Sequence, residues 1–346
     1  MFGLPLIDIL TIIGYFVVVM GIGFWALKRI KNQEDYFLAG RRFGKFVQTF
    51  AAFGQGTSAD SAVAAVVLVA RNGLAGIWVN LLSVFGLPIY WITSVWYRRL
   101  RLLTLGDFFE ERYGSKNLPA LYTIVSSLMF MLVVAISFSA MAKTVVAITE
   151  KPIEKLTVEE RAERELGLEL KELEETDVRL LTPSQKERME ELRVKDPRIN
   201  FSFTNEKLLV AIVAFVVVVY AVMGGLEAAF LTDTLQGIFI IILSIILLPF
   251  AMGKVNSMFG GEGITGVVEI ARSQLSQSMF DIWGSPSMLD FTWYFAIAWF
   301  FMTNINVAVQ ANQLVSTGSA KDEYTARWGF CAGIYLKRFT NLFWGV

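Results

Sequence analysis

The chain has 346 residues, of which 55% are apolar, and it carries 31 basic and 31 acidic side chains. This apolar content exceeds that of a soluble enzyme of similar length, and the long apolar runs predict a polytopic, all-α membrane protein. Histidine is absent and Cys331 is the only cysteine, so His-based zinc, haem and general-base chemistry and an internal disulfide are excluded. We therefore expect no enzymatic activity, and a lipid bilayer rather than a nucleic acid as the partner.

The first apolar segment, residues 7–27, predicts a retained membrane helix, because neither a basic region before it nor a signal-peptide cleavage site is evident. It is followed by a basic loop that carries Lys28, Arg29, Lys31, Arg41, Arg42 and Lys45. A third helix, 77–97, ends in a second basic loop at residues 98–101. Short basic loops lie in the cytoplasm, so we expect a multi-pass protein of the cell membrane with its amino terminus outside.

The second helix, residues 46–71, is long enough at roughly 39 Å to cross a bilayer, yet its middle is polar. The polar residues there are Gly54, Gln55, Gly56, Thr57, Ser58, Asp60 and Ser61. Intramembrane carboxylates usually face a cavity, and glycines weaken the helix. The pattern predicts an interrupted helix whose carbonyls and side chains hold an ion or a solute. A small-residue packing seam is the alternative, although it does not explain Gln55 and Asp60.

A fourth helix is predicted at 118–148, and the charged segment that follows, up to residue 206, is too polar for the membrane. Thr157 with Glu160, and Thr182-Pro183 with Gln185, are typical of capped helix starts. We therefore expect a helical insert outside the membrane, on the outer side by alternation. A solvated helical hairpin and a partner-binding site are both open interpretations of it.

Helices five and six, 208–223 and 226–252, are predicted to meet in a tight turn at Gly224-Gly225. Asp233 lies about 12 Å beyond this turn by helix rise, where a carboxylate needs a partner, water or an ion. A structural pair with a basic loop residue is the alternative. Helix seven, 293–313, turns polar around Asn304, which suggests a cavity, and helix eight runs from 328 to 346.

Four segments resemble the sodium:solute symporter family: DYFLAGRR (35–42), GTSAD (56–60), TLGDFFEERYGS (104–115) and GGLEAAFLTDTLQ (224–236). Residues 306–327 are a weaker match, since Ala311 follows Gln310 where the family usually has arginine. The resemblance implies one leading helix and a leucine-transporter-type core of five plus five helices in inverted repeats. The first helix of each repeat would be unwound at mid-membrane, and about eight helices here would leave the second repeat incomplete.

The resemblance divides the chain into four parts. Residues 1–150 hold the leading helix and the first three core helices, and 151–206 form the outer insert. Residues 207–252 hold the last two helices of the first repeat, and 253–346 hold an outer loop and the first two helices of the second repeat.

The resemblance also assigns roles to residues. Backbone carbonyls of Gly54 and Thr57 would hold Na⁺, with Asp233 on the sodium path. The solute candidates are Gln55, Asp60, Ser61, Asn80, Ser83, Phe300, Phe301 and Asn304, of which Gln55 and Asn304 are chosen for their polarity alone. Helix–helix hydrogen bonding is an alternative for Asn80 and Ser83, and core packing is one for the two phenylalanines.

The function implied is a sodium-coupled symporter that imports a small polar solute by alternating access, with Na⁺ as the coupling ion. In the family, hydroxyl groups of the ninth helix complete the sodium site, so we expect the remaining helices on the same or a second polypeptide. The alternative is a transporter-like membrane sensor that feeds a signalling domain outside this chain. A channel fits poorly, because the polarity is concentrated at mid-depth.

Overall fold

The computed structural model describes residues 5–176, 181–282, 293–309 and 311–345, and for a few helical residues in these ranges it describes the backbone alone. The described residues are almost entirely helical, which confirms the all-α prediction. They form two compact units: unit 1 contains residues 1–17 and 138–216, and unit 2 contains residues 18–137 and 217–346. Each unit is described by itself.

Four helical segments among the described residues are long and apolar enough to cross a membrane. They are α1 (Leu6–Leu27), Ser61–Gly86, α8 (Asn117–Ile148) and α11 (Glu206–Phe259). Helix α11 contains both predicted helices five and six as two arms, and its backbone reverses between them at Gly225, where φ is 55° and ψ is −149°. A Cβ atom at Gly225 would lie 2.6 Å from the carbonyl oxygen of Tyr36, so this turn requires glycine. The number of membrane crossings and the inverted repeat stay predictions.

In unit 1 the insert folds as two helices, α9 (Val158–Glu175) and α10 (Pro183–Lys195), that pack against each other. Both begin with the predicted capping boxes. Met189 and Leu192 are buried, and the ion pairs Glu169–Arg188 and Glu174–Arg193, both 2.9 Å, join the two helices. The predicted helical insert is confirmed as a structure, whereas its place outside the membrane stays a prediction.

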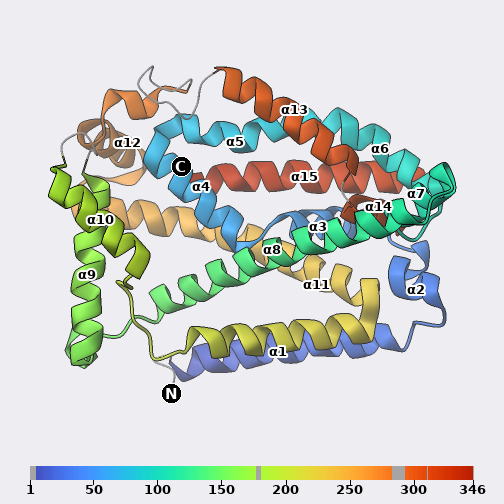
Figure 1. Cartoon of the computed structure of the whole chain (residues 1–346), viewed down its shortest axis with the longest axis horizontal. Helices are drawn as coiled ribbons and strands as arrows, with labels where there is room; N and C mark the ends of the chain where they lie inside the picture. The colour runs from blue at the N-terminus through green and yellow to red at the C-terminus, as the bar shows by residue number, and fades with distance from the viewer. Residues whose placement is uncertain (1–4, 177–180, 283–292, 310, 346) are drawn as a thin grey trace. The chain divides into compact units, whose positions relative to one another are not determined.

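In unit 2, α15 (Glu323–Gly345) packs along α3 (Lys45–Gly56) and α6 (Leu87–Leu100) (Figure 1). Glycines allow this close approach: a Cβ at Gly333 would lie 2.4 Å from the carbonyl oxygen of Thr49. Helix α15 begins five residues before its predicted start (328 − 323), because the Asp322 side chain accepts a hydrogen bond from the Thr325 amide and caps it.

The third predicted helix, 77–97, is wrong as a single element. The structure divides it into η2 (Gly73–Ile77), α5 (Trp78–Leu81), η3 (Leu82–Gly86) and α6. Pro88 lies in the first turn of α6, where the missing amide proton and the fixed φ of proline favour a helix start over a helix interior.

Predicted helix seven, 293–313, is described as α13 (Trp293–Val309) and α14 (Ala311–Gly318), with residue 310 outside the described residues. Its helical structure ends at Gly318, five residues beyond the predicted end (318 − 313). The segment 253–290 contains α12 (Gly263–Gln274).

Several short helices and the two basic loops lie at one end of unit 2 (Figure 1). Helices α2 (Gln33–Leu38), α7 (Leu105–Tyr113) and α14 lie there with the reversal of α11. Phe43 forms a β-bridge with Ala320. The two basic loops and the Gly225 turn therefore share one end, which we call the basic end.

Candidate functional site

The helix through the polar middle of 46–71 is interrupted. Helix α3 ends at Gly56 and α4 (Ala59–Asn72) begins at Ala59. Thr57 and Ser58 between them are extended, with φ/ψ of −118°/116° and −132°/165°. The Ser61 hydroxyl accepts a hydrogen bond from the Ser58 amide at 3.1 Å and starts the second helix. The predicted interruption is confirmed.

The interruption leaves the last carbonyl groups of α3 without the amide donors of a continuing helix. Thr57 satisfies two of them: its hydroxyl donates to Phe53 at 2.7 Å and its amide donates to Gly54 at 3.1 Å. The Gly56 carbonyl instead accepts a hydrogen bond from the ammonium group of Lys337, on α15. The C-terminal end of a helix carries partial negative charge, so the end of α3 is a place where a cation is stabilised.

Sequence analysis missed Lys337. A signal for it existed, since it is a lysine within an apolar helix, and ionisable residues in such segments are expected to have a partner. What the sequence does not contain is the identity of that partner, which is 281 positions away.

Helices α3 and α11 approach each other closely at Gly54. A Cβ atom at Gly54 would lie 2.6 Å from the carbonyl oxygen of Asp233 and 3.1 Å from its Cβ. The Asp233 side chain is partly buried, and no hydrogen bond or ion pair joins it to another described residue. The structure therefore places Asp233 against Gly54, to which the Thr57 amide is hydrogen-bonded; these are the three residues that the family resemblance assigns to sodium.

The structural ion pair considered for Asp233 is made by Glu227 instead. This carboxylate is 5% exposed and lies 3.0 Å from Arg29 and 3.4 Å from Arg42. It ties α11 to the first basic loop at the basic end. Asp233, eight positions beyond the Gly225 turn (233 − 225), lies deeper along the same helix arm.

Gln55 lies beside a cavity of about 420 Å³ in unit 2. The Ser316 hydroxyl donates to the Gln55 side-chain oxygen at 2.6 Å, and this contact joins α3 to α14. The small polar residues that line the cavity besides Gln55 come from α8, α14 and the residue before α7: Thr104, Thr123, Ser126, Ser127, Asn312 and Ser316. Most of the remaining lining is apolar, from Leu105, Phe130, Leu226 and Val315, and an apolar cavity with a few polar groups can hold a small molecule.

None of the other solute candidates whose side chains the structure describes lines this cavity. Asn80 accepts a hydrogen bond at 2.9 Å from Asn341, as the helix–helix alternative expects. Phe300 packs on Phe85 with ring centroids 6.2 Å apart, whereas Phe301 is 60% exposed. The Asn304 amide donates to the Phe300 carbonyl of its own helix at 2.7 Å.

Ser61 is the last candidate whose side chain is described, and it is engaged at the start of α4. The side chains of Asp60 and Ser83 lie outside the described residues, so their roles stay predictions.

Comparison with known proteins places this geometry in context. The model of the sodium:solute symporter family matches residues 36–147 and 202–330, which leaves out the charged insert. The chain is 24% identical over 294 residues to the sodium/pantothenate symporter of Haemophilus influenzae, covering 82% of this chain and 48% of that protein. It is 29% identical over 136 residues to the osmoregulated proline transporter OpuE of Bacillus subtilis, covering 36% of this chain and 27% of that one.

A solved structure supports the fold. It is a substrate-bound, outward-open state of a Na⁺-coupled sialic acid symporter, with a TM-score of 0.62 and 16% identity. The match covers 98% of this chain and 59% of that one. The chain thus spans about half the length of the Haemophilus relative and less than two thirds of the solved one. Because the family model matches more than half of the chain, the chain belongs to the sodium:solute symporter family.

Proposed function

We propose that this chain works as part of a sodium-coupled symporter that imports a small polar solute across the cell membrane by alternating access. The remaining helices are supplied by the same or a second polypeptide. The observation that carries this proposal is the interruption at Thr57–Ser58, which ends α3 within an otherwise apolar segment and leaves its carbonyl groups to partners other than a continuing helix. Such a break is tolerated in a membrane where it lines a cavity or coordinates an ion.

The coupling ion is Na⁺, and its ligands on this chain are the backbone carbonyls of Gly54 and Thr57. Oxygen atoms suit a hard cation, and carbonyl groups bind it without a protonation step. Asp233 lies against Gly54 and supplies the negative charge on the sodium path. A carboxylate that lacks a partner among the described residues is stabilised when a cation approaches it.

The solute is held next to the sodium site, by Gln55 at the cavity of about 420 Å³ and by Asp60 and Ser61 at the start of α4. Asn80, Ser83, Phe300, Phe301 and Asn304 complete the solute site in the conformation that binds the solute. Alternating access requires such contacts to change, and the hydrogen bond between Asn80 and Asn341 is one that opens on solute binding.

Uptake by the complete protein in liposomes tests this function. A panel of small solutes is first screened for binding with and without sodium, and the best ligand is then used for uptake. We expect uptake to require sodium and to be abolished by Asp60→Ala and by Asp233→Asn. Glu323→Gln is the control, because Glu323 is 47% exposed and paired with Arg99 at the surface. Uptake that persists when potassium replaces sodium would overturn the proposal.

A further inference from the structure

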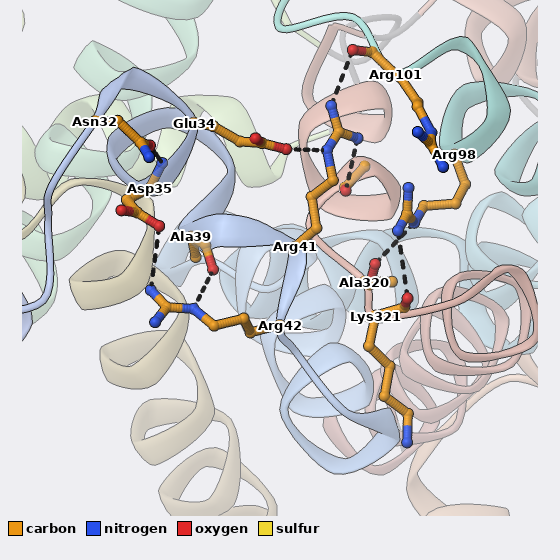
Figure 2. A network of polar contacts seen from close by, with 11 residues as sticks. Asn32, Glu34, Asp35, Ala39, Arg41, Arg42, Arg98, Arg101, Ala320 and Lys321 are labelled. Atoms are coloured by element: carbon orange, nitrogen blue, oxygen red, sulfur yellow. Dashed lines mark hydrogen bonds and ion pairs between the residues drawn. The ribbon is translucent and has the colours of Figure 1, made fainter.

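Three arginines converge on a cavity at the basic end of unit 2 (Figure 2). Arg41 follows α2, while Arg98 and Arg101 lie at the end of α6. The cavity measures about 810 Å³ and is lined by Asn32, Gln33, Glu34, Arg41, Arg98, Arg101 and Leu103. Glu34 is the one acidic residue of this lining, and it pairs with Arg41 at 2.6 Å. Three guanidinium groups against one carboxylate leave two positive charges (3 − 1) at the cavity.

Two of the arginines are committed to the backbone of the fold. Arg41 donates to the carbonyl groups of Gly318 at 3.2 Å and Arg101 at 2.9 Å. Arg98 donates to the carbonyl groups of Ala320 at 2.8 Å and Lys321 at 3.3 Å. These contacts hold the loop after α14 against the basic loops, but a carbonyl oxygen does not neutralise a positive charge.

Arg101 differs from the other two. Its side chain is exposed and forms no hydrogen bond or ion pair with any residue in the described part of the chain. Its backbone is in the left-handed region, with φ of 56° and ψ of 20°. Glycine adopts this conformation most readily, and Arg41 shares it, with φ of 53°.

The three positive charges also act on one another. Burial lowers the pKa of Arg98 most, and the like charges of Arg41 and Arg101 lower it further, whereas Asp322 and Glu323 act in the opposite direction. A ligand that brings negative charge into the cavity removes this repulsion. Guanidinium groups present forked pairs of N–H donors that match the oxygen atoms of a phosphate.

We propose that the cavity lined by Arg41, Arg98 and Arg101 binds a phosphate group, carried by a lipid headgroup or by a small soluble anion. The cavity lies at the end of the unit where the basic loops gather, the position at which membrane proteins contact anionic headgroups. The Arg101 side chain donates hydrogen bonds to the phosphate, while Arg41 and Arg98, which are held by the backbone, add positive charge.

Thermal unfolding of the purified full chain in neutral detergent tests the proposal. One arm compares potassium phosphate with potassium chloride at equal ionic strength, and the other compares dioleoyl-phosphatidylglycerol with dioleoyl-phosphatidylcholine. A headgroup ligand raises Tm with phosphatidylglycerol alone, and a soluble anion raises it with inorganic phosphate. Potassium salts keep the response separate from any effect of sodium.

Arg101→Gly is the decisive variant, because glycine suits the left-handed backbone and the variant should unfold at no lower temperature than the native chain. We expect its midpoint for the phosphate-bearing ligand to rise by roughly tenfold or more, since a charge-assisted contact is lost. Arg71→Gln, which removes a charge at the end of α4, should respond as the native chain does. The proposal is overturned if neither ligand raises Tm, if Arg101→Gly keeps the response, or if Arg71→Gln loses it equally.

Discussion

The contact between Gly54 and Asp233 gives the sharpest test of the sodium site. In Gly54→Ala, the new Cβ would lie 2.6 Å from the Asp233 carbonyl oxygen, where ordinary contact begins at 3.4 Å. Helices α3 and α11 would have to separate by about 0.8 Å (3.4 − 2.6), because the obstructing atom belongs to the backbone. Overpacking of this kind costs about 1–3 kcal/mol.

If this strain is released by moving Gly54 away from Asp233, sodium binding should weaken by about 5- to 150-fold. The assay is the midpoint of the rise in Tm that sodium causes, together with the sodium dependence of uptake by the complete protein. Gly21→Ala is the matched control: nothing lies within 4 Å of its new Cβ, and alanine should stabilise α1 by about 1 kcal/mol. A folded Gly54→Ala protein whose sodium midpoint stays within about twofold of the native value would refute this reasoning.

Three further outcomes are expected. Lys337→Met removes the ammonium group that donates to the Gly56 carbonyl. Because like charges repel at low dielectric, sodium should then bind at least about threefold more tightly. A sodium midpoint at a higher concentration than that of the native chain would contradict this. Glu227→Gln should lower the free energy of unfolding by about 1–3 kcal/mol, because it removes the buried carboxylate that Arg29 and Arg42 share, whereas the exposed Glu323→Gln should cost less than about 0.5 kcal/mol in the same denaturant titration. The hydrogen bond from Arg198 holds the pKa of Glu163 below its usual 4.5, so this pair stabilises the insert above about pH 4.5 and stops doing so as the pH falls through the lowered pKa. Spin labels at the exposed Val158 and Val194 should therefore report a broader distance distribution in acid, and an unchanged distribution down to pH ~2 would argue against the role of this pair.

The parts of the fold that depend on neighbouring residues could be predicted from the sequence. The capping boxes at Thr157 and Thr182 are local hydrogen-bond patterns, and both are present. The interruption in 46–71 is also local, because glycines and hydroxyl residues weaken a helix wherever it packs. The division of 77–97 was available too, since Pro88 disfavours a continuous helix there.

The parts that depend on distant contacts could not be predicted. Asp233 and Glu227 are both acidic residues on the same helix arm, and only the positions of Arg29 and Arg42 decide that Glu227 is the paired one. The contacts of Asn80 with Asn341 and of Gly56 with Lys337 join positions 261 and 281 apart in the chain. Periodicity and motif spacing contain no information about such pairs.

At Gly225 the two helical arms of α11 meet directly, without a loop between them. Because no flexible linker separates them, the angle at which Asp233 faces its neighbour is fixed by counting residues from the turn. Inserting one residue after Gly225 would advance the second arm by about 1.5 Å and swing its side chains through about 100°. The number of residues after the turn therefore sets the direction in which Asp233 faces. Insertions and deletions in this family should be tolerated in the charged insert far better than between Gly225 and Asp233.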